Sequence, residues 1–327
     1  MNYARATNIA VEAIPVIDVG VRDDAAAADG GGIEEVARQM RAAAESVGFF
    51  YVRNHGIPDD LIRRAEDVSR RFFAHSEPEK RAVAPLDRHR GWLQVGQAKM
   101  YAGAKVDLKE SFVWGLDIPA DDPDYVAGNR MHGPNRWPDF LPAMRPALNA
   151  YFEAAHVCGR RLLGAFAASL GVAPDYFNAR FAKPVTRGTL VYYPPQPPDA
   201  GEEQFGVAPH TDYGVLTLVH QDMTGGLQVR TRAGEWVMAH PIPGTLVVNV
   251  GDLLARWTND RFQSTPHRVV NASGRERYSM AIFLDPDFDT PIVPVALGGE
   301  AAHYPPVTCG EYILSRFDRS FAYRSKE

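Results

Sequence analysis

The second half of the chain, from Thr189 onward, consists of short runs of β-forming residues separated by Gly, Pro and Asp. Short runs at this spacing predict an antiparallel sandwich or barrel, and their alternating apolar residues favour a double-sheet jelly roll. The expected strands are 190–193, 215–221, 227–230, 235–238, 246–250, 267–270 and 278–284. A last helix is expected at 308–321.

The first half contains the helical patterns. Apolar residues at helical spacing predict helices at 33–47, 59–73 and 140–170, with a further short helix beginning at Pro174. Gly48 and Gly171 are placed to end two of these helices. Strands are expected at 14–19, 49–54, 91–99 and 111–116, a mobile loop at 22–32, and an irregular segment at 119–136. We therefore predict a mainly β fold with flanking helices, in which an N-terminal helical region packs on a jelly-roll core in one compact unit.

The bulk composition limits the classes of partner. The chain has 327 residues and a net charge of −5, which argues against a nucleic-acid-binding surface. The two cysteines, Cys158 and Cys309, form no spacing pattern and suit a reducing compartment. No apolar run approaches the length of a transmembrane helix. These features predict a cytoplasmic enzyme, monomeric or weakly dimeric, without nucleic-acid or membrane partners.

His210 and Asp212 form the first part of a metal-binding pattern, and His267 follows 55 residues after Asp212. Residues i and i+2 of a strand point to the same side, so His210 and Asp212 are expected to bind one ion from one strand end. Two imidazoles and one carboxylate form the facial triad that binds non-haem Fe(II) and leaves the remaining positions open. His220 and His240 also lie in this half but lack a carboxylate two residues away, and we interpret both as structural or surface residues. His55 lies in a turn of the first half, where we expect a structural role in hydrogen bonding.

Arg277 and Ser279 share one face of a predicted strand ten residues beyond His267. A guanidinium and a hydroxyl on one face suit a buried carboxylate, because Arg binds carboxylates through two charge-assisted hydrogen bonds.

With these motifs the chain resembles the isopenicillin N synthase-like branch of the Fe(II)/2-oxoglutarate oxygenases. The resemblance extends over nearly the whole chain, through the segments 14–18, 48–58, 109–112, 135–138, 192–195 and 310–317. It implies an N-terminal dioxygenase region at 14–135, a jelly-roll core at 186–288 and a C-terminal extension at 289–327. It also implies that His210, Asp212 and His267 bind iron, and that Arg277, Ser279 and Tyr193 bind the distal carboxylate of 2-oxoglutarate.

The resemblance says less about the remaining pocket. Val191 stands where many plant relatives have Asn, and Phe283 occupies a position that lies beside the substrate in relatives; we take both as candidate pocket residues. Arg187, Arg90 and Lys99 lie in segments that could face the cavity and hint at an anionic substrate. The segment 249–252 is interpreted as a buried strand and turn without a chemical role.

Three functions stay open at this point. The first is an oxygenase that uses Fe(II), 2-oxoglutarate and O₂ to hydroxylate or desaturate a small molecule, releasing succinate and CO₂. The second is an oxidase like isopenicillin N synthase, which needs no 2-oxoglutarate. The third is a metal-binding module without oxidative chemistry.

Overall fold

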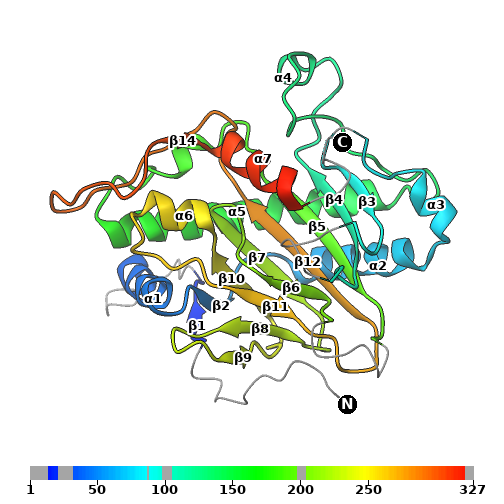
Figure 1. Ribbon diagram of the computed structural model, residues 1–327, viewed down its shortest axis with the longest axis horizontal. Coiled ribbons are helices and arrows are strands. Elements are labelled where there is room, and N and C mark those ends of the chain that lie inside the picture. Colours follow the sequence, from blue (N-terminus) through cyan, green and yellow to red (C-terminus); the bar gives the residue numbers. More distant parts are fainter. Residues whose placement is uncertain (1–13, 21–31, 87, 98–104, 197–203, 321–327) are drawn as a thin grey trace.

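An eight-stranded sheet forms the middle layer of the molecule, with helices on one face and a four-stranded sheet on the other (Figure 1). The structure is a computed structural model that describes residues 14–20, 32–86, 88–97, 105–196 and 204–320. The large sheet has the strand order β1-β2-β10-β7-β12-β5-β4-β3, and the small sheet has the order β6-β11-β8-β9. All pairings in both sheets are antiparallel except β1 with β2. Two facing sheets of this kind confirm the predicted jelly-roll core.

The strands are short, as the spacing of turn residues predicts. The large sheet contains β1 Val16–Asp18, β2 Phe49–Arg53, β3 Gly91–Leu93, β4 Glu110–Gly115, β5 Arg187–Tyr193, β7 Leu216–Gln221, β10 Thr245–Val250 and β12 Arg277–Leu284. The small sheet contains β6 Val207–His210, β8 Leu227–Arg230, β9 Trp236–Met238 and β11 His267–Val269. A separate pair is formed by β13 Pro291–Ile292 and β14 Val307–Thr308.

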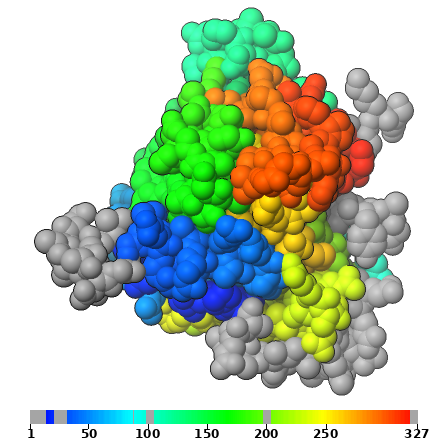
Figure 2. All heavy atoms as spheres, turned by 90° about the vertical axis from the view of Figure 1, so that its left-hand side faces the viewer, coloured from blue at the N-terminus to red at the C-terminus, as the bar shows by residue number. Residues whose placement is uncertain are grey.

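The helices confirm the main periodic segments. They are α1 Ile33–Ser46, α2 Asp59–Ala74, α3 Glu77–Arg81, α4 Pro123–Val126, α5 Met144–Leu170, α6 Asp252–Trp257, α7 Cys309–Ser320 and a 3₁₀ helix at Asn178–Arg180. Gly48 and Gly171 follow α1 and α5 with φ of 69° and 68°, the left-handed conformation that glycine adopts without strain. Figure 2 shows α1 (blue) against the green segment that contains α5, where Arg41 Nη1 donates to the Ser169 carbonyl at 2.8 Å.

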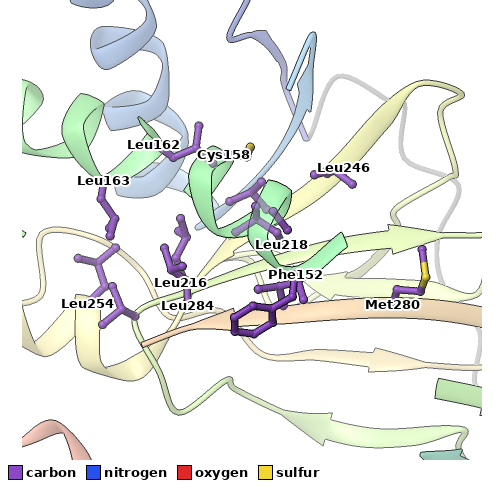
Figure 3. Close-up of a cluster of buried hydrophobic side chains, with 14 of the residues drawn as sticks. Phe152, Cys158, Leu162, Leu163, Leu216, Leu218, Leu246, Leu254, Met280 and Leu284 are labelled. Carbon is purple, nitrogen blue, oxygen red and sulfur yellow. The ribbon is translucent and has the colours of Figure 1, made fainter. Parts of the chain in front are cut away.

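The main hydrophobic core lies between the helical layer and the large sheet. In Figure 3, Leu162 and Leu163 of α5 lie with Leu216 and Leu218 of β7 and Leu284 of β12. These five side chains are at most 2% exposed. Fully burying one such side chain stabilises the fold by about 1.5–3 kcal/mol. The packing of these side chains therefore holds the large sheet against α5.

A smaller apolar cluster lies between the two sheets and surrounds a cavity. It includes Val191 and Tyr193 of β5, Val207 of β6, Leu227 of β8 and Val269 of β11. Among the described residues, no helix is long and apolar enough to cross a membrane.

Five local predictions of secondary structure were wrong. β6 was missed because its four residues include Pro209, which a strand at the edge of a sheet tolerates since its outer N–H groups need no partner. The expected turn after Gly251 is the start of α6. The helix expected at Pro174 is a turn followed by the 3₁₀ helix, and the irregular segment contains α4. The strand expected at 91–99 ends at Leu93, and residues 94–97 form a turn. Residues 98–99 of this expected strand and residues 21–31 of the expected loop lie outside the described residues.

Candidate metal centre

Pairing of β6 with β11 brings the two histidines of the triad together. His210 is the last residue of β6 and stands directly opposite His267, the first residue of β11. Their ring centroids are 4.3 Å apart. The ligand atoms of His210, Asp212 and His267 all lie within 4.8 Å of one another, so the structure assembles the three predicted residues at one point.

Asp212 reaches this point by a route that differs from the prediction. β6 ends at His210, so Asp212 lies in the following turn and does not share a strand face with His210. Its carbonyl accepts a hydrogen bond of 2.7 Å from the backbone N–H of Asp252, at the start of α6. The turn is therefore fixed by α6 and not by strand alternation.

Both imidazoles are held in the tautomer that metal binding requires. Nδ1 of His210 lies 2.8 Å from the carbonyl oxygen of Ala208, and Nδ1 of His267 lies 3.1 Å from that of Thr265. A carbonyl oxygen can only accept, so each Nδ1 carries the proton and each Nε2 presents a lone pair. Both Nε2 atoms lie 3.7 Å from the same carboxylate oxygen, Oδ1 of Asp212.

The other carboxylate oxygen of Asp212 is held by two neighbouring strands. Oδ2 accepts hydrogen bonds from Thr217 Oγ1 of β7 at 2.6 Å and from Asn249 Nδ2 of β10 at 2.8 Å. The interpretation of 249–252 as a segment without a chemical role was therefore wrong. Asn249 orients the carboxylate, and Thr217 was not singled out at all.

Burial and neighbouring charges set the protonation states of His210 and Asp212 at neutral pH. Burial, together with the charge of His267, lowers the pKa of His210 to about 3, so this imidazole is neutral. Burial alone would raise the pKa of Asp212, but the two imidazoles and the hydrogen bonds from Asn249 and Thr217 outweigh it and hold the pKa below its ordinary value. The site therefore offers the carboxylate of Asp212 and the neutral imidazole of His210 as donors, with the imidazole of His267 beside them.

This donor set fits Fe(II). Ligand atoms about 2.1 Å from an ion and at right angles to each other lie about 3 Å apart, so the observed 3.7 Å needs only small side-chain movements. The three donors come from one side, which leaves the other positions of an octahedral ion facing the cavity.

Arg277 lies in the same cavity and is 1% exposed. Its Nε donates to the Gly225 carbonyl at 2.5 Å, Nη1 donates to Ser279 Oγ at 3.4 Å, and its guanidinium carbon lies 4.6 Å from the ring centroid of Tyr193. Within the described part of the chain, no carboxylate pairs with this buried cation. A buried charge without a counter-charge is costly, which makes this end of the cavity suited to an anionic ligand.

The cavity has a volume of about 160 Å³ and lies between the two sheets. Its lining includes the predicted residues His210, Asp212, His267, Arg277, Ser279, Tyr193, Val191, Phe283 and Arg187, and also Lys109, His89, Tyr213 and Phe317, which the sequence analysis did not assign to the site. Arg90 is not in the lining, since its guanidinium donates to the carbonyls of His89 and Met131. Lys99 lies outside the described residues.

The three histidines that were interpreted as structural or surface residues make contacts outside the metal site. Nδ1 of His55 accepts from the backbone N–H of Ile57 at 3.1 Å, which fixes the turn after β2. Nε2 of His220 lies 2.9 Å from Glu66 Oε1 on α2. The carbonyl of His240 accepts from the Tyr51 hydroxyl at 2.7 Å.

Comparisons with known proteins match the same regions. Residues 14–140 match the family described as non-haem dioxygenase in morphine synthesis, N-terminal, and residues 188–286 match the 2OG-Fe(II) oxygenase superfamily. The chain is 35% identical to the 2-oxoglutarate-Fe(II) type oxidoreductase hxnY of Emericella nidulans, over 90% of this chain and 87% of that protein. It is also 35% identical to the homoarginine-6-hydroxylase 2-ODD-233 of Oryza sativa subsp. japonica, over 95% of this chain and 98% of that protein.

A solved structure is similar throughout. The crystal structure of full-length Neurospora crassa T7H in complex with alpha-KG and thymine aligns with a TM-score of 0.79 and 30% identity, covering 93% of this chain and 96% of that chain. These relatives favour an enzyme that uses 2-oxoglutarate over the isopenicillin N synthase-like oxidase and over a module without oxidative chemistry. The chain therefore belongs to the 2OG-Fe(II) oxygenase superfamily, and it is an oxidoreductase whose cofactors are Fe(II) and 2-oxoglutarate.

Proposed function

We propose that this enzyme hydroxylates or desaturates a C–H bond of a small molecule, with His210, Asp212 and His267 as the iron ligands. Arg277, Ser279 and Tyr193 are proposed to bind the distal carboxylate of 2-oxoglutarate. The observation that carries this assignment is the buried guanidinium of Arg277, which has no carboxylate partner among the described residues and lines the same cavity as the triad.

When bound, iron supplies the activation of O₂, and 2-oxoglutarate supplies two electrons as it is converted to succinate and CO₂. The protein's own residues do the rest. Thr217 and Asn249 hold Asp212 Oδ2, so that Oδ1 faces the two Nε2 atoms. Gly225, Gln221 and Ser279 fix the plane of the Arg277 guanidinium, so that it is already oriented when an anion arrives.

Residues of the small sheet and of the C-terminal helix line this cavity and limit its contact with solvent. Val207 and Val269 close it on the side of the small sheet, and Phe317 of α7 contributes to its lining. Exclusion of water strengthens the charge interactions at Arg277 and limits side reactions during oxidation.

The assignment of the chain to regions is part of the same proposal. Residues 14–135 form the N-terminal region, 186–288 the oxygenase core and 289–327 the extension that contains α7. We further propose that the enzyme acts in the cytoplasm as a monomer or weak homodimer. Light scattering over a concentration series tests the oligomeric state.

Arg277→Leu tests the assignment of the cosubstrate site. Removing one partner of a buried charge pair costs about 2–5 kcal/mol, which at about 1.4 kcal/mol per tenfold weakens 2-oxoglutarate binding by roughly 30- to 3,000-fold. The loss is expected in the apparent KM for 2-oxoglutarate, because Arg277 contacts the part of the cosubstrate that does not react. A shorter apolar keto acid has no distal carboxylate and needs no counter-charge. The variant should therefore prefer 2-oxoglutarate over this keto acid less strongly than the wild type does, or should prefer the keto acid.

The measurement is keto-acid consumption and succinate release by both proteins, with and without candidate prime substrates. Arg261→Leu is the control, since Arg261 pairs with Glu300 and does not line the cavity. Unchanged 2-oxoglutarate affinity in Arg277→Leu would end the assignment.

A further inference from the structure

A second buried cation, Arg187, lies at the end of the cavity remote from Arg277. Both side chains line the cavity, and Arg187 is 4% exposed. On β5, Tyr193 pairs with Arg277 of β12, whereas Arg187 pairs with Phe283. Six residues separate the two positions, which at about 3.4 Å per residue is roughly 20 Å. The cavity therefore has a cation at each end.

Arg187 is held in one orientation by three neighbours. Its Nη1 donates to Asp285 Oδ2 at 2.7 Å, and its guanidinium carbon lies 4.8 Å from the ring centroid of Phe283 and 4.9 Å from that of Phe317. Asp285 is itself fixed, because its Oδ1 accepts from the backbone N–H of Val215 at 3.0 Å. The bond to Asp285 is the one hydrogen bond that Arg187 makes to a described side chain. Most of the five N–H donors of Arg187 therefore stay available at the cavity wall.

Strand register places the backbone of Arg187 near the strand that holds a metal ligand. Arg187, Phe283 and Thr217 form one row across β5, β12 and β7. Two strand spacings of about 4.8 Å separate the ends of the row by roughly 10 Å. Thr217 holds the carboxylate of Asp212. A small molecule anchored at Arg187 can therefore present a C–H bond to the metal position while its polar end stays at the cavity wall.

The charges around the cavity distinguish classes of small molecule. Lys109 adds a third cation to the lining, with its Nζ 3.6 Å from Oδ2 of the buried Asp107. Asp212 is the one carboxylate in the lining among the described residues, and we have assigned it to iron. A cationic group on the substrate therefore finds no free carboxylate there, which argues against transferring the homoarginine substrate of the plant relatives to this chain.

We propose that Arg187 is the subsite for a carboxylate of the prime substrate, so that the enzyme oxidises a small carboxylic acid with an apolar body. The planar fork of an Arg matches both oxygens of a carboxylate, and Phe283 and Phe317 provide apolar walls beside it. This inference rests on the proposed function, since it names the substrate class of the same site.

The test measures binding by titration calorimetry under nitrogen, with Fe(II) and saturating 2-oxoglutarate and therefore without turnover. The probes are phenylacetate, cinnamate and hexanoate, each compared with its primary amide. We expect at least one acid to bind at least tenfold more tightly than its amide. The double variant Arg187→Gln/Asp285→Asn should bind this acid at least tenfold more weakly than the wild type does. It should also bind the acid no more tightly than the amide.

The double variant removes both charges together and so leaves no unpaired buried carboxylate. Arg187→Lys keeps a cation beside Asp285 but lacks the fork, and it should retain part of the acid preference. Arg261→Gln/Glu300→Gln is the matched control, because it neutralises an ion pair outside the cavity and should bind the acid as the wild type does. If the double variant does not fold, the acid-to-amide ratio of wild type and Arg187→Lys decides the matter.

Several results would overturn the proposal. It fails if no acid binds, if acids and amides bind equally, or if Lys109→Met loses the acid while the Arg187 variants keep it. It also fails if Arg277→Leu loses the acid instead, because the acid then occupies the cosubstrate end. A separate 2-oxoglutarate titration of the wild type tests the proposed function. Acid binding is also measured on metal-free protein. Failure of the carboxylate subsite and failure of the proposed function therefore give separate results.

Discussion

Thr217 and Leu218 are adjacent on β7 and belong to opposite faces of the large sheet. Leu218 is fully buried against the helical layer, and Thr217 holds the carboxylate of Asp212 in the cavity. The same alternation runs along β12, where Ile282 packs in the main core and Phe283 lines the cavity. Because side chains on a strand alternate with a period of two, one sheet separates the face that stabilises the fold from the face that carries the chemistry. Neighbouring substitutions should therefore change different properties.

The largest effect is expected on the cavity face, in Asp212→Ala. Under the proposed assignment, this change removes one of three protein bonds to iron and the one anionic donor among the ligands, so turnover should fall to background. Equilibrium dialysis with Fe(II) and succinate release measure the loss, and circular dichroism should show an unchanged fold. Asp67→Ala removes an exposed carboxylate of α2 and serves as the control. Wild-type turnover by Asp212→Ala at stoichiometric iron would contradict the triad.

On the opposite face, Leu218→Ala should lower the free energy of unfolding and leave the chemistry intact. Truncation of a fully buried Leu leaves a cavity and costs about 2–5 kcal/mol. Urea unfolding measures this cost. The affinity for 2-oxoglutarate, determined well below the unfolding midpoint, should stay at the wild-type value. A large change in cosubstrate affinity would mean that the two faces are coupled through the sheet.

Thr217→Val then provides the adjacent comparison. Valine has nearly the shape of threonine but cannot donate to Asp212 Oδ2, so the carboxylate loses one of its two side-chain hydrogen bonds. Loss of a partner that orients a metal ligand usually lowers metal affinity by about 10- to 100-fold. Fe(II) dialysis should show this loss, whereas urea unfolding should shift less than in Leu218→Ala. The opposite ranking of the two variants would reverse the assignment of the faces.

The sequence predicted the features that depend on local pattern. His210, Asp212 and His267 have a diagnostic spacing, and Arg277 and Ser279 share a strand face because they are two residues apart. The helices α1, α2 and α5 follow from periodicity and from glycines that end two of them.

The features that it missed depend on which strands pair. Asn249 is 37 residues from Asp212 in the sequence. It reaches the carboxylate because β10 pairs with β7, beside the turn that contains Asp212. A polar Asn inside an otherwise apolar strand was the available signal, but hydrophobicity alone hid it. Strand parity also gave the wrong reason for the position of Asp212, because α6 was not foreseen.

The smallest effect concerns a titratable group in the helical layer, His156 of α5. Its ring lies near those of Phe152 and Phe181, and Nε2 has no hydrogen-bond partner among the residues that the structure describes. Burial, with the charge of Arg160, lowers the pKa of His156 from its ordinary value of 6.5 to about 4. The unfolded chain therefore binds a proton between these values that the folded chain does not, so stability is fully present above pH 6.5 and falls as the pH drops towards 4. His156→Phe cannot titrate and should flatten this part of the profile, while burial of His55 and His132, whose pKa values are also lowered, keeps some slope. Urea midpoints at pH 7.5, 6.5 and 5.5 measure the difference between the two proteins. An identical slope in wild type and variant would show that the acid sensitivity of this layer arises elsewhere, whereas a flatter slope would show that the helical face contributes pH dependence without taking part in the chemistry.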